Sequence, residues 1–91
     1  MTSTHYACAC CGYKTMEAPA SGTFDICPVC FWEDDLVQLR DPDFQGGANL
    51  PSLRQAQANF LKVGASSTES LESVRKPTPE EARDTSWKRL V

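Results

Sequence analysis

Two stretches decide the fold of this 91-residue chain: Cys8-Ala9-Cys10-Cys11-Gly12-Tyr13 and Cys27-Pro28-Val29-Cys30. Taken as two pairs, they give the pattern Cys-x2-Cys-x15-Cys-x2-Cys, a spacing that is typical of zinc sites. Each Cys-x-x-Cys turn brings two sulfurs to one point, and two such turns supply four tetrahedral ligands at about 2.3 Å from the metal. The sequence therefore predicts one structural zinc ion, bound by Cys8, Cys11, Cys27 and Cys30.

A chain of this size is expected to need a metal for its stability. A protein of this length buries only about 60–65% of the surface that its unfolded form exposes, so its core is marginal. Small domains of this kind are often stabilised by a disulfide, a metal or a partner. Because four protein ligands close a tetrahedral site, no coordination position is left for a substrate. We therefore expect a structural metal and no enzymatic activity.

The rest of the sequence argues against three other roles for the cysteines: structural disulfides, a thioredoxin-like redox motif and inert buried residues. Residues 1–5 contain no basic start and no apolar run, so they predict no secretory signal. No stretch approaches the 18 apolar residues of a membrane span. A cytoplasmic location is expected, and thiols stay reduced there, which disfavours structural disulfides. A thioredoxin-like redox motif would need a βαβ context that is missing, and four inert buried cysteines would not explain the spacing.

Cys10 is the fifth cysteine and has no role in this pattern. It lies between Cys8 and Cys11, so it is a candidate to replace either as a ligand. A thiol near cations or turn amides can also become reactive. A packed thiol without chemistry is the simplest interpretation, and the three alternatives stay open.

The rest of the sequence predicts a small α+β zinc ribbon with two knuckles, a short hairpin and one packed helix. That helix is expected over residues 52–63, because Ser52 and Gln55 form a capping box and Gly64 suits the left-handed position after a helix. A strand is expected at residues 23–26 and one helical turn within 33–39. Residues 1–7 form a lead-in and 8–65 the cysteine-rich domain. Residues 66–91 are expected to be a linker and a short helix or tail, with a helix start at Thr78 and a body over residues 82–90.

Charge is unevenly distributed along the chain. Residues 1–50 carry seven acids and two bases, whereas residues 51–91 carry five acids and seven bases. A nucleic-acid-binding domain normally has a basic face, so nucleic acid is disfavoured as a partner. A basic protein is the partner that an acidic surface would attract. The candidate partner-binding residues are Glu33, Asp34, Asp35, Asp41 and Asp43, with Trp87 as a candidate interface anchor.

Aromatic residues gather near the cysteines. Tyr13, Phe24, Phe31 and Trp32 lie within or beside the cysteine-rich segment, and Phe60 lies on the apolar face of the predicted helix. We expect these five side chains to form a miniature core over the metal. A platform for stacking bases would need a basic groove as well.

These stretches resemble a bacterial cysteine-rich family that is named for its CPCC motif. The resemblance rests on residues 8–13 and on Ile26-Cys27-Pro28-Val29-Cys30-Phe31-Trp32-Glu33-Asp34-Asp35. It continues through residues 41–43 and 46–49 to Ala56, Asn59 and Phe60, about 8–65 in all. Ala9 stands where the family motif has Pro, a change that removes no ligand. The resemblance implies a small zinc-ribbon fold and an immunity-type or adaptor role, with a toxin as a possible protein partner.

The paired knuckles also resemble rubredoxin, which uses iron for electron transfer. In its second knuckle, rubredoxin has Gly after the last cysteine, whereas this chain has Phe31. The loss of that Gly is expected to keep a backbone amide away from the sulfur, which favours zinc over iron. Two alternatives to an interaction module therefore remain: a rubredoxin-like electron carrier and a nucleic-acid-binding zinc ribbon.

Overall fold

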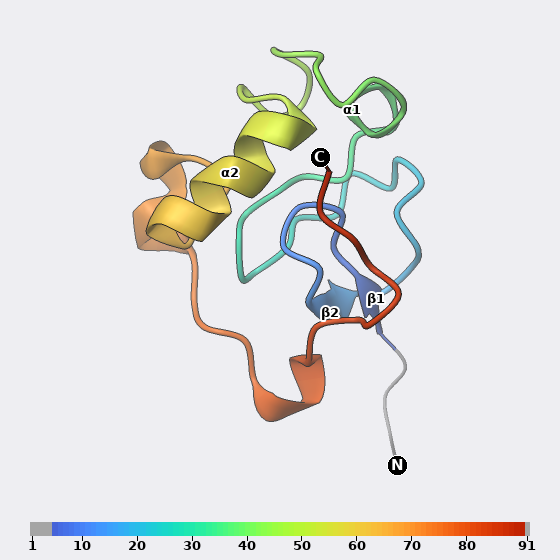
Figure 1. Cartoon of the computed structure of the whole chain (residues 1–91), viewed down its shortest axis with the longest axis vertical. Helices are drawn as coiled ribbons and strands as arrows, with labels where there is room; N and C mark the ends of the chain where they lie inside the picture. The colour runs from blue at the N-terminus through green and yellow to red at the C-terminus, as the bar shows by residue number, and fades with distance from the viewer. Residues whose placement is uncertain (1–4, 91) are drawn as a thin grey trace.

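The computed structural model describes residues 5–90 and contains a small antiparallel hairpin, two α-helices and two 3-10 helices. The hairpin consists of β1 (Tyr6–Ala7) and β2 (Lys14–Met16), paired with Tyr6 opposite Met16 and Ala7 opposite Lys14. Its loop carries the first cysteine pair, and in Figure 1 this loop (blue) runs from the strands toward the middle of the molecule. Residues 1–4 of the expected lead-in lie outside the described part of the chain.

Helix α2 (Leu53–Val63) confirms the predicted helix nearly to the residue. Ser52 accepts a hydrogen bond from the Gln55 backbone and the Gln55 side chain accepts one from Ser52, which completes the capping box. Gly64 ends the helix in the left-handed conformation, with φ of 83°. Leu53 and Ala56 turn inward and join the buried cluster around the cysteines.

Helix α1 (Leu36–Arg40) falls partly within the segment where one helical turn was expected. Its N-cap is Asp35, whose side chain accepts a hydrogen bond from the backbone of Gln38. Gln38 is completely buried between α1 and the following loop, where its amide N–H donates to the carbonyls of Phe44, Asn49 and Pro51. This single side chain fixes the course of the loop that leads into α2.

Two expected elements are absent from the described residues. The predicted strand at 23–26 is wrong, because Phe24 has φ of 64° and the extended course is broken there; Ile26 forms only an isolated bridge with Glu33. The predicted helical body over 82–90 is also wrong. After η2 (Pro79–Glu81) the chain is irregular, because its backbone bonds to the first knuckle: Lys14 donates to the Ala82 carbonyl and Asp84 to the Gly12 carbonyl.

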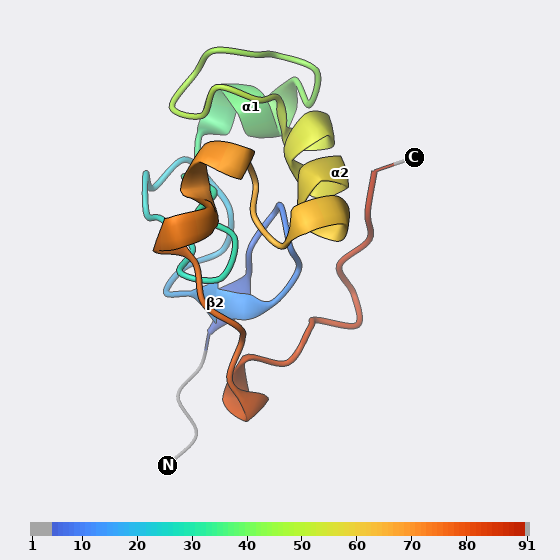
Figure 2. The same ribbon diagram turned by 90° about the vertical axis from the view of Figure 1, so that its left-hand side faces the viewer.

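The C-terminal segment therefore lies along the cysteine-rich part of the chain. Helix η1 (Thr68–Ser73) follows α2 closely, and the red terminal stretch runs past the hairpin and α2 (Figures 1 and 2). Of the expected aromatic core, Trp32 is buried and Tyr13 and Phe60 are partly buried against the cluster. Phe24 and Phe31 are exposed, at 61% and 37%, so placing these two in the core was wrong. None of the described helices is long and apolar enough to cross a membrane.

Candidate metal centre

Both cysteine pairs lie on turns with the same backbone hydrogen bonds. In the first knuckle (residues 8–13), Gly12 donates to the Cys8 carbonyl at 2.8 Å and Cys8 donates to the Tyr13 carbonyl at 3.0 Å. In the second knuckle (residues 27–32), the same two bonds join Phe31 to Cys27 at 2.7 Å and Cys27 to Trp32 at 2.9 Å. The fifth position is left-handed in both, with φ of 80° at Gly12 and 70° at Phe31. The two knuckles are thus structural repeats that present their sulfurs alike.

The two knuckles bring four sulfurs to one buried point. The Sγ atoms of Cys8, Cys11, Cys27 and Cys30 all lie within 4.8 Å of one another, and each residue is at most 1% exposed. The Cys8 and Cys30 sulfurs are 3.5 Å apart, and the Cys11 and Cys27 sulfurs are 3.8 Å apart. A tetrahedral ion with sulfur ligands at about 2.3 Å sets its ligands about 3.8 Å apart. The donor set therefore has the chemistry and the spacing of a four-cysteine metal site.

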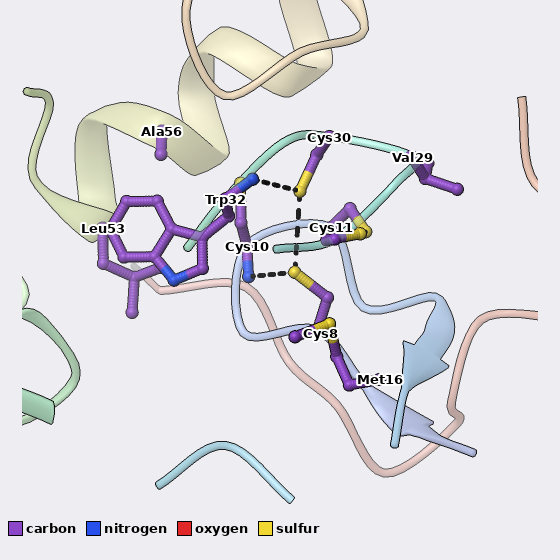
Figure 3. Close-up of a cluster of buried hydrophobic side chains, with 10 residues drawn as sticks. Cys8, Cys10, Cys11, Met16, Val29, Cys30, Trp32, Leu53 and Ala56 are labelled. Carbon is purple, nitrogen blue, oxygen red and sulfur yellow. Dashed lines mark hydrogen bonds between the residues drawn. The ribbon is translucent and has the colours of Figure 1, made fainter. Parts of the chain in front are cut away.

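Three polar groups point at these sulfurs. The backbone N–H groups of Cys10 and Trp32 donate to the Cys8 and Cys30 sulfurs, each at 3.4 Å (Figure 3). The Thr15 hydroxyl lies 3.0 Å from the Cys27 sulfur, where it can donate to a thiolate. Such contacts stabilise metal-bound thiolates and orient them. Thr15 follows Cys11 by four residues, and no sequence pattern marked it.

The Trp32 contact corrects one expectation. The absence of Gly after Cys30 was expected to keep a backbone amide away from the sulfur, and that inference was used to favour zinc over iron. The N–H of Trp32 reaches the Cys30 sulfur all the same, because Phe31 adopts the left-handed conformation that Gly would have adopted. The knuckle backbone therefore does not discriminate between the two metals.

In the protein without metal, the four thiols share protons. The hydrogen bond between Cys11 and Cys27 raises the pKa of Cys11 and lowers the pKa of Cys27, because one sulfur holds the proton and the other accepts it. Hydrogen bonding with Cys10 raises the pKa of Cys30. Burial adds to the cost of charging the thiols. A divalent cation would remove this cost by replacing the protons.

Cys10 is as buried as the four clustered cysteines, with 1% of its surface exposed. It belongs to the same apolar cluster, but it is outside the group of four whose sulfurs converge. Its backbone N–H, rather than its thiol, faces the Cys8 sulfur. In this arrangement Cys10 is a packed thiol beside the site, and it interacts with Cys30.

Two of the predicted partner-binding carboxylates are buried and used within the chain. Asp34 is 3% exposed and accepts four hydrogen bonds, from the backbone of Ser21, Gly22 and Thr23 and from the Thr23 hydroxyl. Burial alone would raise the pKa of Asp34, but these four donors favour the carboxylate and lower the pKa below its usual value. Asp34 therefore holds the loop before the second knuckle, and assigning it to a docking face was wrong.

Asp35 is also turned inward, with 8% of its surface exposed. One of its oxygens caps α1, and the other accepts a 2.8 Å hydrogen bond from the backbone of Ala48, the main reason that its pKa is lowered. Assigning Asp35 to the docking face was wrong for the same physical reason. Glu33 is partly exposed, and Asp41 and Asp43 are exposed, with Asp43 in a surface ion pair with Arg54 at 2.7 Å. The partner-binding role of these three remains a prediction.

Trp87 covers the first knuckle. Its indole N–H donates to the Ala9 carbonyl at 3.1 Å, and its ring lies where a side chain on Gly12 would be, 2.4 Å from the position of a Cβ atom. Arg83 sits beside it, with its guanidinium over the rings of Tyr13 and Trp87 at 4.6 and 5.5 Å. Much of the Trp87 ring is therefore engaged within the chain, and its role as an interface anchor remains a prediction.

These features define a small α+β protein with one candidate four-cysteine metal site. A family model described as "Cysteine-rich CPCC" matches residues 6–81. The chain therefore belongs to the cysteine-rich CPCC family, and the match extends well past the expected limit at residue 65. A search of curated proteins finds no match to the chain.

Proposed function

We propose that this chain is a non-enzymatic interaction module of the zinc-ribbon type, whose fold depends on one zinc ion. The convergence of four buried sulfurs within 4.8 Å carries the metal part of this proposal. Cys8, Cys11, Cys27 and Cys30 would be the ligands. Zinc is preferred over ferrous iron because thiolate sites generally bind zinc more tightly.

The metal would stabilise the fold rather than perform a reaction. Four thiolates fill a tetrahedral coordination shell, so the site offers no position at which water or a substrate could be activated. In small peptides, structural zinc contributes about 10–16 kcal/mol, as much as the whole stability of a typical domain. This contribution would compensate for the small core of the protein.

The interaction part of the proposal rests on the surface. A basic protein, of which a toxin neutralised by an immunity-type protein is one example, fits the exposed carboxylates Asp41 and Asp43 and the partly exposed Glu33. Among the described residues, no group of three or more metal-binding side chains gathers outside the four cysteines.

Metal analysis of the protein purified from its native host tests the first part. We expect one zinc per chain, a colourless protein, and loss of the folded circular dichroism spectrum when a chelator removes the metal. Strong visible absorption from sulfur-to-iron charge transfer would instead support the rubredoxin-like electron carrier and overturn the zinc proposal.

A binding assay tests the second part. We expect the zinc-loaded chain to bind a basic polypeptide and to show no affinity for DNA or RNA at physiological salt. Affinity for nucleic acid that falls steeply as salt rises would support the nucleic-acid-binding alternative instead.

A further inference from the structure

A groove with both apolar and polar lining residues opens beside the second knuckle. This groove, here called the Phe31 groove, has a volume of about 160 Å³ and lies between the knuckle, the loop before α2 and helix η1. In Figure 2, η1 (orange) lies beside the segment that carries this knuckle. The residues of the groove that matter here are Ile26, Phe31, Glu33, Leu50, Pro51 and Glu69.

The apolar side chains of the groove are open to solvent. Ile26 is 46% exposed, Phe31 37% and Leu50 69%, although a chain this short has few large apolar residues to leave outside its core. Contiguous exposed apolar residues on a small protein mark interaction surfaces more often than isolated ones do. The groove therefore offers apolar contact area that no described residue of the chain covers.

Phe31 is held in the groove at an energetic cost. Its φ of 70° lies in the left-handed region, where a residue with a bulky side chain pays about 1–2 kcal/mol relative to Gly. The equivalent position of the first knuckle is Gly12, which has no such cost. Backbone strain that persists at an exposed side chain is common at binding sites, where the strained residue performs a task that the relaxed one would not.

The charges around the groove determine what it can accept. Its lining includes Glu33 and Glu69 and no Lys or Arg. A neighbouring hollow shares Ile26 and adds Glu17 and Asp25, again without a base. The opposite holds for three other hollows, whose charged lining residues are all basic: Arg83 and Arg89, Arg75 and Lys76, and Lys88. The charged residues that line the Phe31 groove and the hollow beside it are thus all acidic, whereas those that line the other three hollows are all basic.

We infer that the Phe31 groove binds a polypeptide segment in which large apolar residues alternate with Lys or Arg. The apolar side chains of that segment would contact Ile26, Phe31 and Leu50, and its cations would face Glu33 and Glu69. This inference rests on the proposed interaction function and assigns it to one surface. It moves the recognition site away from Asp34 and Asp35, which are buried.

A titration of the full zinc-loaded chain, followed by ¹⁵N NMR, tests the inference. The probes are three synthetic octapeptides in which Leu alternates with Lys, with Ser or with Glu. We expect the Lys peptide to shift the backbone amides of Ile26, Phe31 and Leu50. The Ser peptide should bind about ten-fold more weakly and the Glu peptide should not bind at the groove.

Matched variants identify the groove as the binding surface. Phe31→Gly should weaken the Lys peptide about ten-fold or more, since a central aromatic contact is lost. Phe24→Gly is the control, because Phe24 is also a left-handed exposed Phe but does not line the groove; it should change the affinity less than two-fold. Glu33→Gln and Glu69→Gln should each weaken binding about two- to five-fold, and less so at high salt. Leu50 lines the groove but lies outside both knuckles. If the Phe31→Gly protein does not fold, Leu50→Ser can be used in its place and should also weaken binding of the Lys peptide.

Each other outcome overturns the inference in a distinct way. Shifts by the Lys peptide that avoid the groove would refute the groove and leave the interaction function standing. The absence of any shift with all three peptides at about 1 mM, a concentration that detects even weak binding, would refute both. Shifts of the groove that depend on protein concentration alone would make a second copy of the chain the occupant, and would overturn the proposed partner chemistry.

Discussion

The two knuckles of the candidate metal site share one backbone conformation and differ in what covers them. In the first, Gly12 occupies the left-handed position, and Trp87 and Arg83 pack over it from the C-terminal segment. In the second, Phe31 occupies that position and its side chain is exposed. The same turn is therefore closed on one side of the molecule and open on the other. Both knuckles supply the backbone that places the sulfurs. Only the second knuckle also presents an exposed aromatic side chain at the surface.

The largest expected effect on stability is the same for a cysteine substitution in either knuckle. Cys11→Ser and Cys30→Ser would remove equivalent ligands of the proposed zinc, and each should abolish cooperative unfolding, because the loss of a contribution of about 10–16 kcal/mol is as large as the stability of a typical domain. Chelation of the wild-type metal should have the same effect. Zinc content and urea denaturation followed by circular dichroism are the measurements.

Cys10→Ser is the control for those two variants, because the Cys10 sulfur lies outside the converging group. It should retain one zinc per chain and a cooperative transition. A folded Cys30→Ser protein without metal would show that the apolar cluster alone holds the fold. It would also show that the two knuckles are not equal partners.

The second prediction affects the closed knuckle only. Gly12→Ala should cost about 2–5 kcal/mol in free energy of unfolding, because it combines a left-handed φ of 80° with a Cβ atom only 2.4 Å from the Trp87 ring. Gly46→Ala is the matched control: its φ is 79° but nothing lies within 4 Å, so it should cost only about 1–2 kcal/mol. Urea denaturation of both zinc-loaded variants gives the comparison.

The contact with Trp87 can be isolated from the backbone strain. Adding Trp87→Ala to Gly12→Ala should make the second substitution less costly than it is alone, because the two residues touch. If the two costs simply add, the C-terminal segment does not press on the first knuckle in solution, and the contrast between closed and open knuckles is lost.

The third prediction concerns the loop that leads into the open knuckle. Asp34→Asn should lower the free energy of unfolding by about 2–3 kcal/mol at pH 7, because four hydrogen bonds lose a charged acceptor. The pKa of Asp34 is lower in the folded state than the value of about 3.9 for a free Asp, so its contribution is complete above about pH 5 and is lost as the pH falls through 3.9 toward the folded pKa.

Urea denaturation between pH 7 and pH 3.5 measures this effect as a difference between wild type and variant, since acid release of the metal is common to both. The difference should be constant down to about pH 5 and should narrow on further acidification. Asp25→Asn, at an exposed carboxylate close by, should change stability by less than about 0.5 kcal/mol. An equal effect at both positions would contradict a specific role for Asp34.

The features that were predictable from the sequence are those fixed by close neighbours. The pairing of the cysteines depends on residues three apart, and the capping box of α2 depends on Ser52 and Gln55, so both could be predicted from spacing alone. The helix start at Thr78 is likewise a local capping box, and it is present. The course of the chain after Thr78 depends instead on distant residues: residues 82–84 bond to the first knuckle, some seventy positions earlier, and do not continue a helix.

The errors in the site have the same origin. Asp34 and Asp35 look like a surface charge run, but all partners of Asp34 and one of the two backbone partners of Asp35 lie eleven to thirteen residues away, and such partners leave no pattern in the sequence. Phe31 looks like a core aromatic until the backbone of the knuckle is known. In the left-handed position that corresponds to Gly12, Phe31 is exposed, and of these two neighbouring aromatic residues only Trp32 is in the core.

The smallest expected effect on stability falls at the open knuckle. Phe31→Gly removes about 1–2 kcal/mol of left-handed strain, but it adds about 0.5–1 kcal/mol of chain entropy to the unfolded state and loses the contacts that the exposed ring still makes within the chain. These terms nearly cancel, so the free energy of unfolding in urea should change by less than about 1 kcal/mol. Phe24→Gly relieves the same strain at a more exposed ring and should be slightly more stabilising.

If Phe31→Gly instead costs more than about 2 kcal/mol, the ring is part of the core and is not free to contact a partner. A near-neutral result means that Phe31 adds nothing to the stability of the chain in spite of its strain, which leaves the ring free to contact a partner.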